Sequence, residues 1–506
     1  MPETIYDIAI IGSGPAGYTA AIRAGQYGLK TALIEKDGFL GGTCLHVGCI
    51  PTKALLFNAE IWDHLKDAKE FGIEGVDARK LNWGAIQERK SKIVSKHAKG
   101  LEFLMRKNKV ETIKGYGKLT GPAQSGVFTI ELAKSDRKTL KAKNIILATG
   151  SEARMIPGLE PSDRVLTNIE ILKLGEIPKS LVVVGAGAVG VEFASIFRSF
   201  DAEVTILEML PRLVPVEDED ISKELARAYR KRVTNFFTGA KVEKIDKTKS
   251  GIAVTFSADG KQQKIEAEKI LIAVGRKPRT DNVGLEKTRI QADRGFIKTS
   301  EWMETAEPGI YAIGDIVLGT PQLAHVGAME GIVAVAKIAG KPDKPIDLLK
   351  IPNCTYCHPE IGSVGLSEAK AKEAGHNVKV GKFPFTANSR ASIVGEHEGF
   401  VKIVSDAEYG EILGVHIIGP QATELIAEAV TAMELEATIE DLMWTIHAHP
   451  TLAEAMLDAS NSVYGLAINN SRSWITPPVC NCSNGWSTCV KTASSATYFC
   501  CSSTPR

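Results

Sequence analysis

The sequence predicts an α/β protein of several domains, and two copies of one motif carry most of this prediction. Residues 12–17 read GSGPAG and residues 185–190 read GAGAVG, and an apolar run precedes each. Each is a GxGxxG turn, which joins a buried strand to a helix and lets the backbone cradle a phosphate group. From about residue 352 onward no such turn appears. We therefore expect two dinucleotide-binding (Rossmann-like) domains and a C-terminal α+β interface domain.

The composition is that of an ordinary globular protein, and it argues against several other classes. The chain has 506 residues, of which 44% are hydrophobic and 24% are charged, with a formal net charge of +1. This length suggests several domains. The near-neutral charge predicts no nucleic-acid partner, and no apolar run suggests a membrane span. The first residues resemble neither a secretory signal nor a transit peptide, so we expect a cytoplasmic protein.

The first GxGxxG unit opens the chain. Residues 6–11 form an apolar run typical of a buried parallel strand, and the small residues 15–25 suit a helix that packs closely on it. Residues 31–34 predict the second strand, which Glu35 closes. A carboxylate at this position can accept hydrogen bonds from ribose hydroxyls.

The second unit repeats this order. Residues 181–184 predict a strand, 191–199 a helix and 203–207 the next strand, and Glu208 follows Gly185 by 23 positions, as Glu35 follows Gly12. One GxGxxG alone is often only a glycine-rich turn, but two copies with matched spacing make chance unlikely. Glu208 would repel a 2′-phosphate, and Arg212 stands four residues beyond it. The second unit therefore favours NAD over NADP.

Later apolar runs predict the remaining strands of the two domains. Residues 145–150 and 270–275 each end in a glycine and read as strands that pass the chain between the domains. Residues 251–267 alternate around an Asp-Gly pair, which predicts a hairpin. Residues 308–315 predict another buried strand that ends at Gly314 and Asp315.

A cysteine pair carries the strongest chemical signal. Residues 41–53 read GGTCLHVGCIPTK, so Cys44 and Cys49 stand five apart, and no further cysteine occurs before position 354. We expect one distorted helix over residues 44–58, with Pro51 kinking its first turn so that the sulfurs can meet. A helix N-terminus stabilises a thiolate. Two buried free cysteines are the structural alternative, and the flanking residues favour a redox pair.

Near the end of the predicted domains, residues 447–454 read HAHPTLAE. A histidine oriented by a carboxylate is a suitable base near pH 7, and a thiol must lose its proton before it attacks a disulfide. Five positions separate His449 from Glu454, so helix geometry alone does not guarantee their contact. For His447, a structural role and a place in a substrate channel remain equally open.

Together these motifs resemble those of the flavoprotein pyridine nucleotide-disulfide oxidoreductases. Their residues are most similar to those of the dihydrolipoamide dehydrogenases. His46 and Thr52 depart from that pattern, which usually has Asn and Ser at these places. The resemblance implies oxidation of protein-bound dihydrolipoyl groups and reduction of NAD, with FAD held by the first unit and NAD by the second. It implies that Cys49 faces the flavin as a thiolate and that Cys44 exchanges with substrate.

The resemblance also implies roles for residues that the patterns alone do not assign. Lys53 would lie beside the flavin and pair with Glu192, and Asp315 would hold the ribityl chain. The protein would be a homodimer in which His449 and Glu454 serve the disulfide of the other subunit. Its partners would be lipoyl domains of 2-oxoacid dehydrogenase acyltransferases or the carrier protein of the glycine cleavage system.

The resulting site prediction has two groups of residues. The predicted catalytic residues are Cys44, Cys49, His449 and Glu454, and no metal ligand is predicted. The predicted cofactor residues are Gly12, Gly14, Gly17, Glu35, Lys53, Gly150, Gly314 and Asp315 for FAD, and Gly185, Gly187, Gly190, Glu192, Glu208 and Gly275 for NAD. The predicted domains are residues 1–150 and 281–350 for FAD binding, 151–280 for NAD binding, 351–470 for dimerisation and 471–506 as a disordered Cys-, Ser- and Thr-rich tail.

The sequence also argues against two alternative functions and against a redox role for a second cysteine pair. Glutathione or mercuric reductase is the nearest rival, and Glu208 without a nearby arginine cluster argues against an NADPH-dependent enzyme. A non-catalytic subunit would be expected to have lost a cysteine or the His-Glu pair. Cys354 and Cys357 form a CxxC in a segment that reads as a strand, which would point them to opposite faces, so a structural role is favoured.

Overall fold

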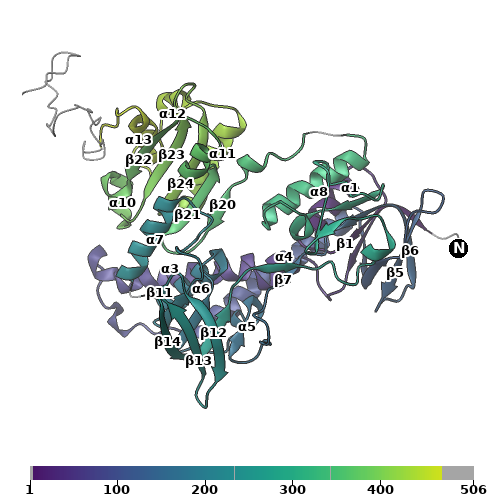
Figure 1. Cartoon of the computed structure of the whole chain (residues 1–506), viewed down its shortest axis with the longest axis horizontal. Coiled ribbons are helices and arrows are strands. Elements are labelled where there is room, and N and C mark those ends of the chain that lie inside the picture. Colours follow the sequence, from purple (N-terminus) through teal and green to yellow (C-terminus); the bar gives the residue numbers. More distant parts are fainter. Residues whose placement is uncertain (1–3, 233, 342–343, 470–506) are drawn as a thin grey trace, which may run out of the picture.

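The computed structural model describes residues 4–232, 234–341 and 344–469, and the predicted tail lies outside them. Figure 1 shows three packed regions, each built on its own main sheet. Two have parallel dinucleotide-binding cores and the third has an antiparallel sheet with helices, so the predicted fold class is confirmed.

The first region combines the start of the chain with a later return segment. Its parallel core is a sheet of order β3-β2-β1-β6, extended by β5 and β4, and β19 pairs with β6. Its elements are β1 (Ile5–Ile11), α1 (Pro15–Gln26), β2 (Thr31–Glu35), α2 (Gly42–Val47), α3 (Cys49–Lys66), α4 (Trp83–Lys107), β3 (Glu111–Lys114), β4 (Tyr116–Leu119), β5 (Phe128–Ala133), β6 (Thr139–Leu147), β19 (Ile310–Ala312) and α8 (Ala324–Ile338).

Small residues let two helices of this region approach closely. A Cβ on Gly331 of α8 would lie 2.8 Å from the carbonyl oxygen of Ala16 in α1, and one on Gly327 would lie 3.1 Å from the Ala16 methyl. Both helices therefore meet almost backbone to backbone. This packing holds the start of α1, where the first phosphate loop ends, against the turn after β19.

The second region repeats the arrangement with strand order β11-β10-β9-β15-β8 and adds a three-stranded antiparallel sheet of order β12-β13-β14. Its elements are β8 (Val165–Leu166), α5 (Asn168–Ile171), β9 (Ser180–Val184), α6 (Ala188–Ser199), β10 (Glu203–Leu207), α7 (Glu219–Lys231), β11 (Asn235–Phe237), β12 (Lys241–Lys247), β13 (Ile252–Ala258), β14 (Lys261–Ala267) and β15 (Lys269–Ile272). The predicted hairpin corresponds to β13 and β14, which turn at Asp259 and Gly260.

The chain enters and leaves this second region side by side. β7 (Ser151–Ala153) and β16 (Arg276–Pro278) form an antiparallel two-stranded ladder. Gly150 and Gly275 stand just before these strands with positive φ angles of 71° and 110°. Their carbonyl groups accept hydrogen bonds from the backbone of the opposite crossing, at 2.8 and 3.0 Å. The predicted borders at 150 and 280 lie beside these crossings.

The C-terminal region is a sheet of order β20-β21-β24-β23-β22 with helices packed on it. Its elements are β20 (Asn353–Thr355), β21 (Glu360–Gly365), α9 (Glu368–Glu373), β22 (Val378–Pro384), α10 (Ser389–Val394), β23 (Phe400–Asp406), β24 (Ile412–Gly419), α11 (Ala422–Glu434), α12 (Ile439–Trp444) and α13 (Glu454–Val463). β23 and β24 are buried along almost their whole length, because helices cover one face and the second region lies at the other.

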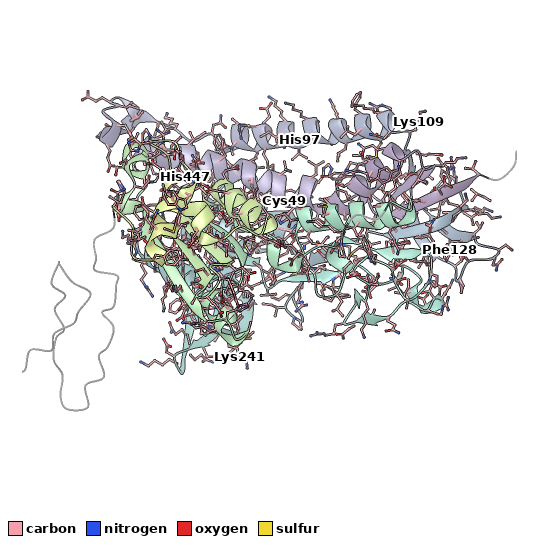
Figure 2. The ribbon with its side chains drawn as sticks, turned by 90° about the horizontal axis from the view of Figure 1, so that it is seen from above. Cys49, His97, Lys109, Phe128, Lys241 and His447 are labelled. Atoms are coloured by element: carbon pink, nitrogen blue, oxygen red, sulfur yellow. The ribbon has the colours of Figure 1, made fainter. Side chains whose placement is uncertain are left out.

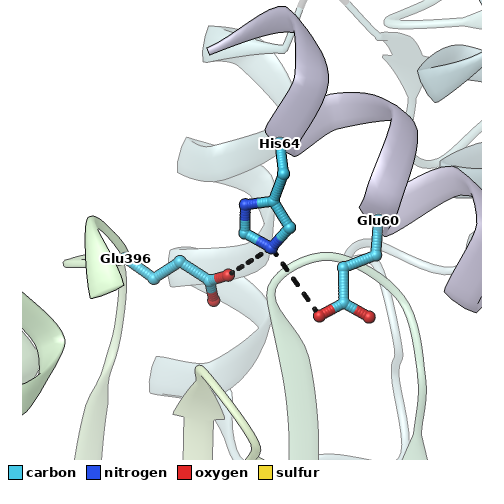
Figure 3. Close-up of side chains that lie close together, drawn as sticks. All are labelled: Glu60, His64 and Glu396. Atoms are coloured by element: carbon cyan, nitrogen blue, oxygen red, sulfur yellow. Dashed lines mark ion pairs between the residues drawn. The ribbon is translucent and has the colours of Figure 1, made fainter. Parts of the chain in front are cut away.

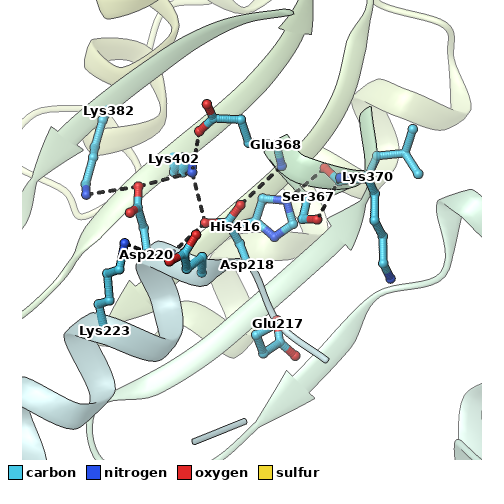
Figure 4. Close-up of polar contacts among 12 residues, drawn as sticks. Glu217, Asp218, Asp220, Lys223, Ser367, Glu368, Lys370, Lys382, Lys402 and His416 are labelled. Carbon is cyan, nitrogen blue, oxygen red and sulfur yellow. Dashed lines mark hydrogen bonds and ion pairs between the residues drawn. The ribbon is translucent and has the colours of Figure 1, made fainter. Parts of the chain in front are cut away.

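A buried lysine joins the second region to the C-terminal sheet (Figure 4). The Nζ atom of Lys402 lies 2.9 Å from Asp218, 3.1 Å from Asp220 and 2.9 Å from Glu368, and its side chain is 3% exposed. Burial alone would lower the pKa of Lys402, but its hydrogen bonds to the carboxylates outweigh burial and raise it. The lysine is therefore charged, and it neutralises acids from two regions at once.

Replacing Lys402 with methionine should destabilise the protein by about 3–5 kcal/mol, because the carboxylates that remain would be buried without their cation. Unfolding in urea, followed by circular dichroism, measures this loss. The matched control is Lys223→Met, which removes an exposed lysine 2.9 Å from Glu219. That surface pair should contribute no more than about 1 kcal/mol. Equal losses in the two variants would contradict the assigned role of Lys402.

Candidate active site

The first phosphate loop is shaped by glycines that no other residue could replace without strain. Gly12 has a φ of +108°, and a Cβ there would lie 2.2 Å from the carbonyl oxygen of Ala148. A Cβ on Gly17 would lie 1.9 Å from the carbonyl oxygen of Gly12. Gly14, which caps α1, has open space where its Cβ would stand. A phosphate group fits against this open position at the helix N-terminus.

The second loop has the same geometry. Gly185 has a φ of +103°, and its Cβ would lie 2.4 Å from the carbonyl oxygen of Ala273. A Cβ on Gly190 would lie 1.9 Å from the carbonyl oxygen of Gly185, and Gly187 again faces open space at the start of α6. Both loops thus fit a dinucleotide phosphate.

The acid at the end of each second strand folds back on its own loop. Glu35 accepts hydrogen bonds from the backbone and hydroxyl groups of Ser13, at 2.9 and 2.6 Å, and from the backbone of Asp37 at 2.9 Å. Glu208 accepts the equivalent backbone bonds from Ala186 at 2.6 Å and Leu210 at 2.8 Å. Both carboxylates are therefore buried beside their own phosphate loop. At this position they could accept hydrogen bonds from a ribose.

Arg212 does not supply a phosphate site beside Glu208. Its guanidinium donates to the carbonyl oxygens of Pro215 at 2.9 Å and Glu217 at 3.2 Å. Arg212 therefore stabilises the loop that contains it and is engaged there. This agrees with the predicted preference for a nucleotide without a 2′-phosphate.

The cysteine segment lies directly on the first phosphate loop. The backbone N–H of Gly41 donates to the carbonyl oxygen of Ser13 at 2.9 Å, and a Cβ on Gly42 would lie 2.7 Å from the Cα of Gly14. Gly41 and Gly42 also have positive φ angles of 113° and 57°. These contacts bring the two thiols to the edge of the site that the first loop forms.

The prediction of one continuous helix over residues 44–58 was wrong. α2 ends at Val47, and Gly48, with φ −144° and ψ −116°, breaks the helix before α3 begins at Cys49. A Cβ on Gly48 would lie 2.9 Å from the carbonyl oxygen of Thr43, so the break needs glycine. The break, rather than a kink at Pro51, brings Cys44 back to the first turn of α3.

The two thiols are half-buried and interact through a hydrogen bond. That bond, donated by Cys44, lowers the pKa of Cys49, and the charge of Lys53 lowers it further against the effect of burial. The same bond and burial raise the pKa of Cys44. Cys49, at the N-terminus of α3, is therefore the better thiolate of the two.

Lys53 lies one turn along α3 from Cys49, and its Nζ atom contacts the two carboxylate oxygens of Glu192 at 2.7 and 2.8 Å. Glu192 is buried at 4% exposure. It also accepts a hydrogen bond from the backbone N–H of Tyr356 at 3.0 Å. Glu192 therefore faces α3 and the cysteines, and this geometry supports its pairing with Lys53 rather than a contact with NAD.

Tyr356 contacts Lys53, and the sequence patterns did not identify this residue. Its ring lies 4.6 Å from the Nζ atom of Lys53, within the range of a cation–π interaction. Burial raises the pKa of Tyr356 to about 12, so the phenol stays neutral beside the lysine. The residue thus positions the Lys53–Glu192 pair from the C-terminal region.

Tyr356→Leu should slow reduction of the disulfide by about five- to tenfold, because the loss of a cation–π contact of roughly 1 kcal/mol frees Lys53. Tyr356→Phe keeps the ring and the backbone donor and is the matched control. Rapid-reaction absorbance and the pH profile of the Cys49 thiolate measure the effect. A leucine variant with the wild-type pH profile would show that the ring has no influence on the lysine.

The two departures from the usual motif have structural partners. The hydroxyl group of Thr52 donates to the carbonyl oxygen of Gly48 at 2.7 Å, a bond that serine would also provide. The imidazole of His46 lies 2.7 Å from the carbonyl oxygen of Leu40 and 4.0 Å from the ring centre of Phe39. Neither residue intrudes on the two thiols.

Asp315 lies next to the paired crossings between the first two regions. The hydroxyl group of Ser151 donates to its carboxylate, and the Nε atom of Arg276 lies 3.8 Å from the same oxygen. Ser151 and Arg276 come from β7 and β16 and were missed by sequence reasoning. Their polar groups converge there although the residues are 125 positions apart.

Gly314 is held by an acid that also escaped prediction. Glu330 of α8 is fully buried and accepts the backbone N–H of Gly314 at 2.5 Å. Its second carboxylate oxygen is buried without a partner in the described part of the chain. Burial raises the pKa of Glu330 to about 7. A carboxylate oxygen without a hydrogen-bond partner, beside Gly314 and Asp315, agrees with the binding of a cofactor near this turn.

His449 and Glu454 meet at the surface of the C-terminal region. The Nδ1 atom of His449 lies 2.9 Å from Glu454, which also accepts the backbone N–H of Thr451 at 2.8 Å. The side chain of His449 is 71% exposed. Because Glu454 occupies Nδ1, the Nε2 atom of the imidazole is turned outward and can take a proton from another molecule.

His447 has a different environment. Its Nε2 atom lies 2.7 Å from Glu428, its Nδ1 atom lies 2.9 Å from the carbonyl oxygen of Thr445, and its side chain is 6% exposed. The bond to Glu428 raises its pKa. With both ring nitrogens engaged, His447 supports the structure around His449. Figure 2 shows it in the C-terminal region, away from Cys49.

Cys354 and Cys357 of the CxxC have separate backbone partners. β20 ends at Thr355, so the predicted strand covers Cys354 but not Cys357. Cys354 donates to the carbonyl oxygen of Thr423, and the buried Cys357 donates to that of Pro359. Burial raises the pKa of Cys354 to about 11, which makes it a poor thiolate.

Two phosphate loops, a thiol pair on the first loop and an exposed His-Glu pair define a dinucleotide-dependent disulfide oxidoreductase. The chain belongs to the pyridine nucleotide-disulphide oxidoreductase family, whose model matches residues 6–331, and the dimerisation domain of that family matches residues 351–460. The predicted family is confirmed, and with it the predicted cofactors of the class, FAD and NAD.

Curated relatives narrow the comparison. The chain is 45% identical over 474 residues to the dihydrolipoyl dehydrogenase of Bacillus subtilis, covering 92% of this chain and 99% of that one. It is 41% identical to leghemoglobin reductase of Glycine max, covering 93% and 90%. The crystal structure of LpdA from Mycobacterium tuberculosis superposes with a TM-score of 0.83 at 27% identity, covering 90% of this chain and 98% of that chain.

Of the helices that the structure describes, none combines the length and the apolar character that a bilayer span requires.

Proposed function

We propose that this protein is a dihydrolipoamide dehydrogenase, which oxidises protein-bound dihydrolipoyl groups and reduces NAD. One observation carries the proposal: the Cys44–Cys49 pair stands at the start of α3, on the first phosphate loop, beside the Lys53–Glu192 pair. Its relatives named dihydrolipoyl dehydrogenase agree with this assignment.

The chemistry begins with the cysteines as a disulfide. One thiol of the substrate, deprotonated by His449, attacks the sulfur of Cys44, and Cys49 leaves as a thiolate that the positive charge of Lys53 stabilises. The second substrate thiol then attacks the substrate sulfur of this mixed disulfide and closes the lipoyl disulfide. Cys44 is released and takes up the proton of the second thiol. Two electrons have now passed from the substrate to the cysteine pair, and of the two substrate protons one is on His449 and one is on Cys44.

The remaining residues bind the cofactors. Gly12, Gly14, Gly17 and Glu35 would hold FAD, with Lys53, Gly150, Gly314 and Asp315 around it, and Gly185, Gly187, Gly190, Glu208 and Gly275 would hold NAD. When bound, FAD accepts the two electrons from the reduced cysteine pair and passes them on as a hydride. At Gly275, which follows β15, a Cβ would meet no atom within 4 Å.

We further propose that the working protein is a homodimer in which each His449 serves the disulfide of the other subunit. The exposure of His449 supports this, because its outward nitrogen is accessible to another subunit, and no hydrogen bond joins it to a thiol among the described residues. The partners are lipoyl domains of 2-oxoacid dehydrogenase acyltransferases or the carrier protein of the glycine cleavage system. A cytoplasmic, reducing setting suits a pair that must cycle between thiol and disulfide.

Anaerobic titration of the flavin-loaded protein with dihydrolipoamide tests the proposed function. About one equivalent per chain should produce a long-wavelength absorbance from the Cys49 thiolate beside the flavin. Subsequent addition of NAD should remove this absorbance and yield NADH. Reduction by NADH without any reaction with dihydrolipoamide would instead indicate a different disulfide substrate.

NADH should be preferred over NADPH by at least about a hundredfold, because a 2′-phosphate would lie against the buried carboxylate of Glu208. Steady-state rates with each reductant measure the preference. Glu208→Gln removes the repulsion and should reduce the difference between the rates with NADH and NADPH. Glu203→Gln, on the exposed start of β10, is the matched control. Equal rates in the wild-type protein would overturn the assignment of Glu208.

A further inference from the structure

A cavity of about 190 Å³ lies where the end of α3 meets the C-terminal region, apart from the phosphate loops and the cysteines. Its lining is rich in carboxylates: Glu60, Asp63, Asp67, Glu70, Glu396 and Glu398. Among the described residues that line it, Arg232 provides the one permanent positive charge. The cavity therefore has an excess of negative charge.

Three side chains converge at this cavity with the chemistry of metal ligands (Figure 3). Glu60 and His64 lie one turn apart on α3, and Glu396 faces them from the segment that follows α10. The Nε2 atom of His64 lies 3.9 Å from Glu60 and 3.8 Å from Glu396. The three candidate ligand atoms all lie within 4.8 Å of one another.

The acids of the cavity differ in their ion-pair partners. Asp63 pairs with Lys66 at 3.4 Å and with Arg232 at 3.4 Å. No lysine or arginine among the described residues forms an ion pair with Glu60 or Glu396, which share the imidazole of His64. A cation between the two carboxylates would offset their mutual repulsion.

A second histidine also lines the cavity. His358 is half-buried there, and no hydrogen bond to its imidazole is found among the described residues. Burial lowers the pKa of His358 to about 3, so the ring is neutral at physiological pH. The acceptor nitrogen of a neutral imidazole can bind a water molecule that a cation holds.

We propose that Glu60, His64 and Glu396 form a binding site for a divalent transition-metal cation such as Mn²⁺ or Zn²⁺. One imidazole and two carboxylates suit these ions, and water would complete the coordination. Metal–ligand bonds of about 2.1 Å place neighbouring ligands about 3.4 Å apart in a tetrahedral site. The His64 contacts, at 3.9 and 3.8 Å, would therefore need to shorten by roughly half an ångström. The two carboxylate ligand atoms, which lie within 4.8 Å of each other, would need to approach by up to about 1.4 Å through side-chain rotation.

The site would tie two parts of the molecule together. Glu60 and His64 stand on α3, which begins at Cys49, whereas Glu396 belongs to the C-terminal region. Because an ion that binds only the folded protein stabilises it by mass action, the cation should raise the melting temperature. This property is independent of lipoamide chemistry.

Binding of Mn²⁺ to the flavin-loaded, oxidised protein tests the proposal. Mn²⁺ prefers oxygen and nitrogen ligands, so the cysteines of the chain do not compete. The signal of free Mn²⁺ in electron paramagnetic resonance should show one saturable site per chain, and excess Zn²⁺ should displace the ion. Glu396→Gln and His64→Ala should each weaken binding at least about tenfold and abolish the rise in melting temperature.

His97→Ala removes an exposed histidine from α4 and is the matched control, which should bind as the wild type does. Glu60→Gln and Glu396→Gln are isosteric changes, so they remain informative if His64→Ala fails to fold. Melting curves in chelator show that each variant is intact. The absence of saturable binding up to millimolar Mn²⁺, or unchanged binding in both glutamine variants, would overturn the proposed site.

Discussion

Replacement of Cys44 by serine is expected to lower lipoamide turnover by at least about a thousandfold, the scale seen when a reacting nucleophile is removed. No disulfide can form, so the substrate has no sulfur to attack. Flavin binding should persist, because the first loop and Glu35 are untouched. The Cys49 thiolate should also persist, because the serine hydroxyl can still donate the hydrogen bond that the Cys44 thiol provides, and Lys53 and the helix N-terminus still stabilise the charge.

Cys49→Ser separates the roles of the two thiols. This variant should also lose turnover, but its flavin should lack the long-wavelength absorbance, because the group that carries the negative charge beside the flavin is gone. Absorbance spectra and turnover of both variants, measured at equal flavin content, give the comparison. If Cys44→Ser lost the long-wavelength absorbance and Cys49→Ser kept it, the roles of Cys44 and Cys49 would have to be exchanged.

His449→Gln should slow lipoamide turnover by at least about a hundredfold, the usual scale for a positioned acid–base group. Reduction of bound flavin by NADH should be unchanged, because no thiol needs to lose its proton in that step. Glu454→Gln should have a smaller effect in the same direction, since Glu454 orients the imidazole and does not itself take the proton. Stopped-flow absorbance separates the two half-reactions.

The exposure of His449 makes a second test possible. If two chains share each site, heterodimers of Cys44→Ser and His449→Gln subunits should regain up to about half of the activity, because one of their two sites has both groups intact. Homodimers of either variant are the controls. Verified heterodimers without activity would mean that the base and the cysteines act within one chain.

Local features of the fold were predictable from sequence. The GxGxxG loops, their strands and the acids at 35 and 208 follow from glycine geometry and apolar periodicity, which depend on neighbours in the chain. The Cys44–Cys49 pair was predicted from its spacing and flanking residues, whereas the contact between His449 and Glu454 was expected only from the family resemblance. The proposed roles of these residues remain predictions until the variants are measured.

Contacts between distant segments could not be predicted in this way. Tyr356 meets Lys53, Ser151 meets Arg276, and Lys402 meets acids from two other elements only after three regions have packed together. The helix break at Gly48 was missed because glycine also occurs within helices, and its contact with Thr43 becomes visible only in the folded segment. No local pattern distinguishes such residues from ordinary surface or core positions.

The paired crossings β7 and β16 determine how the nucleotide-binding region can move. Two separate linkers would leave it free to swing and twist, whereas hydrogen-bonded strands resist torsion about the connection. Any large rotation would have to break the ladder and the bonds at Gly150 and Gly275 in the same event. The region should therefore behave as a stiffly mounted body, which keeps the distance between two bound cofactors nearly constant through each catalytic cycle.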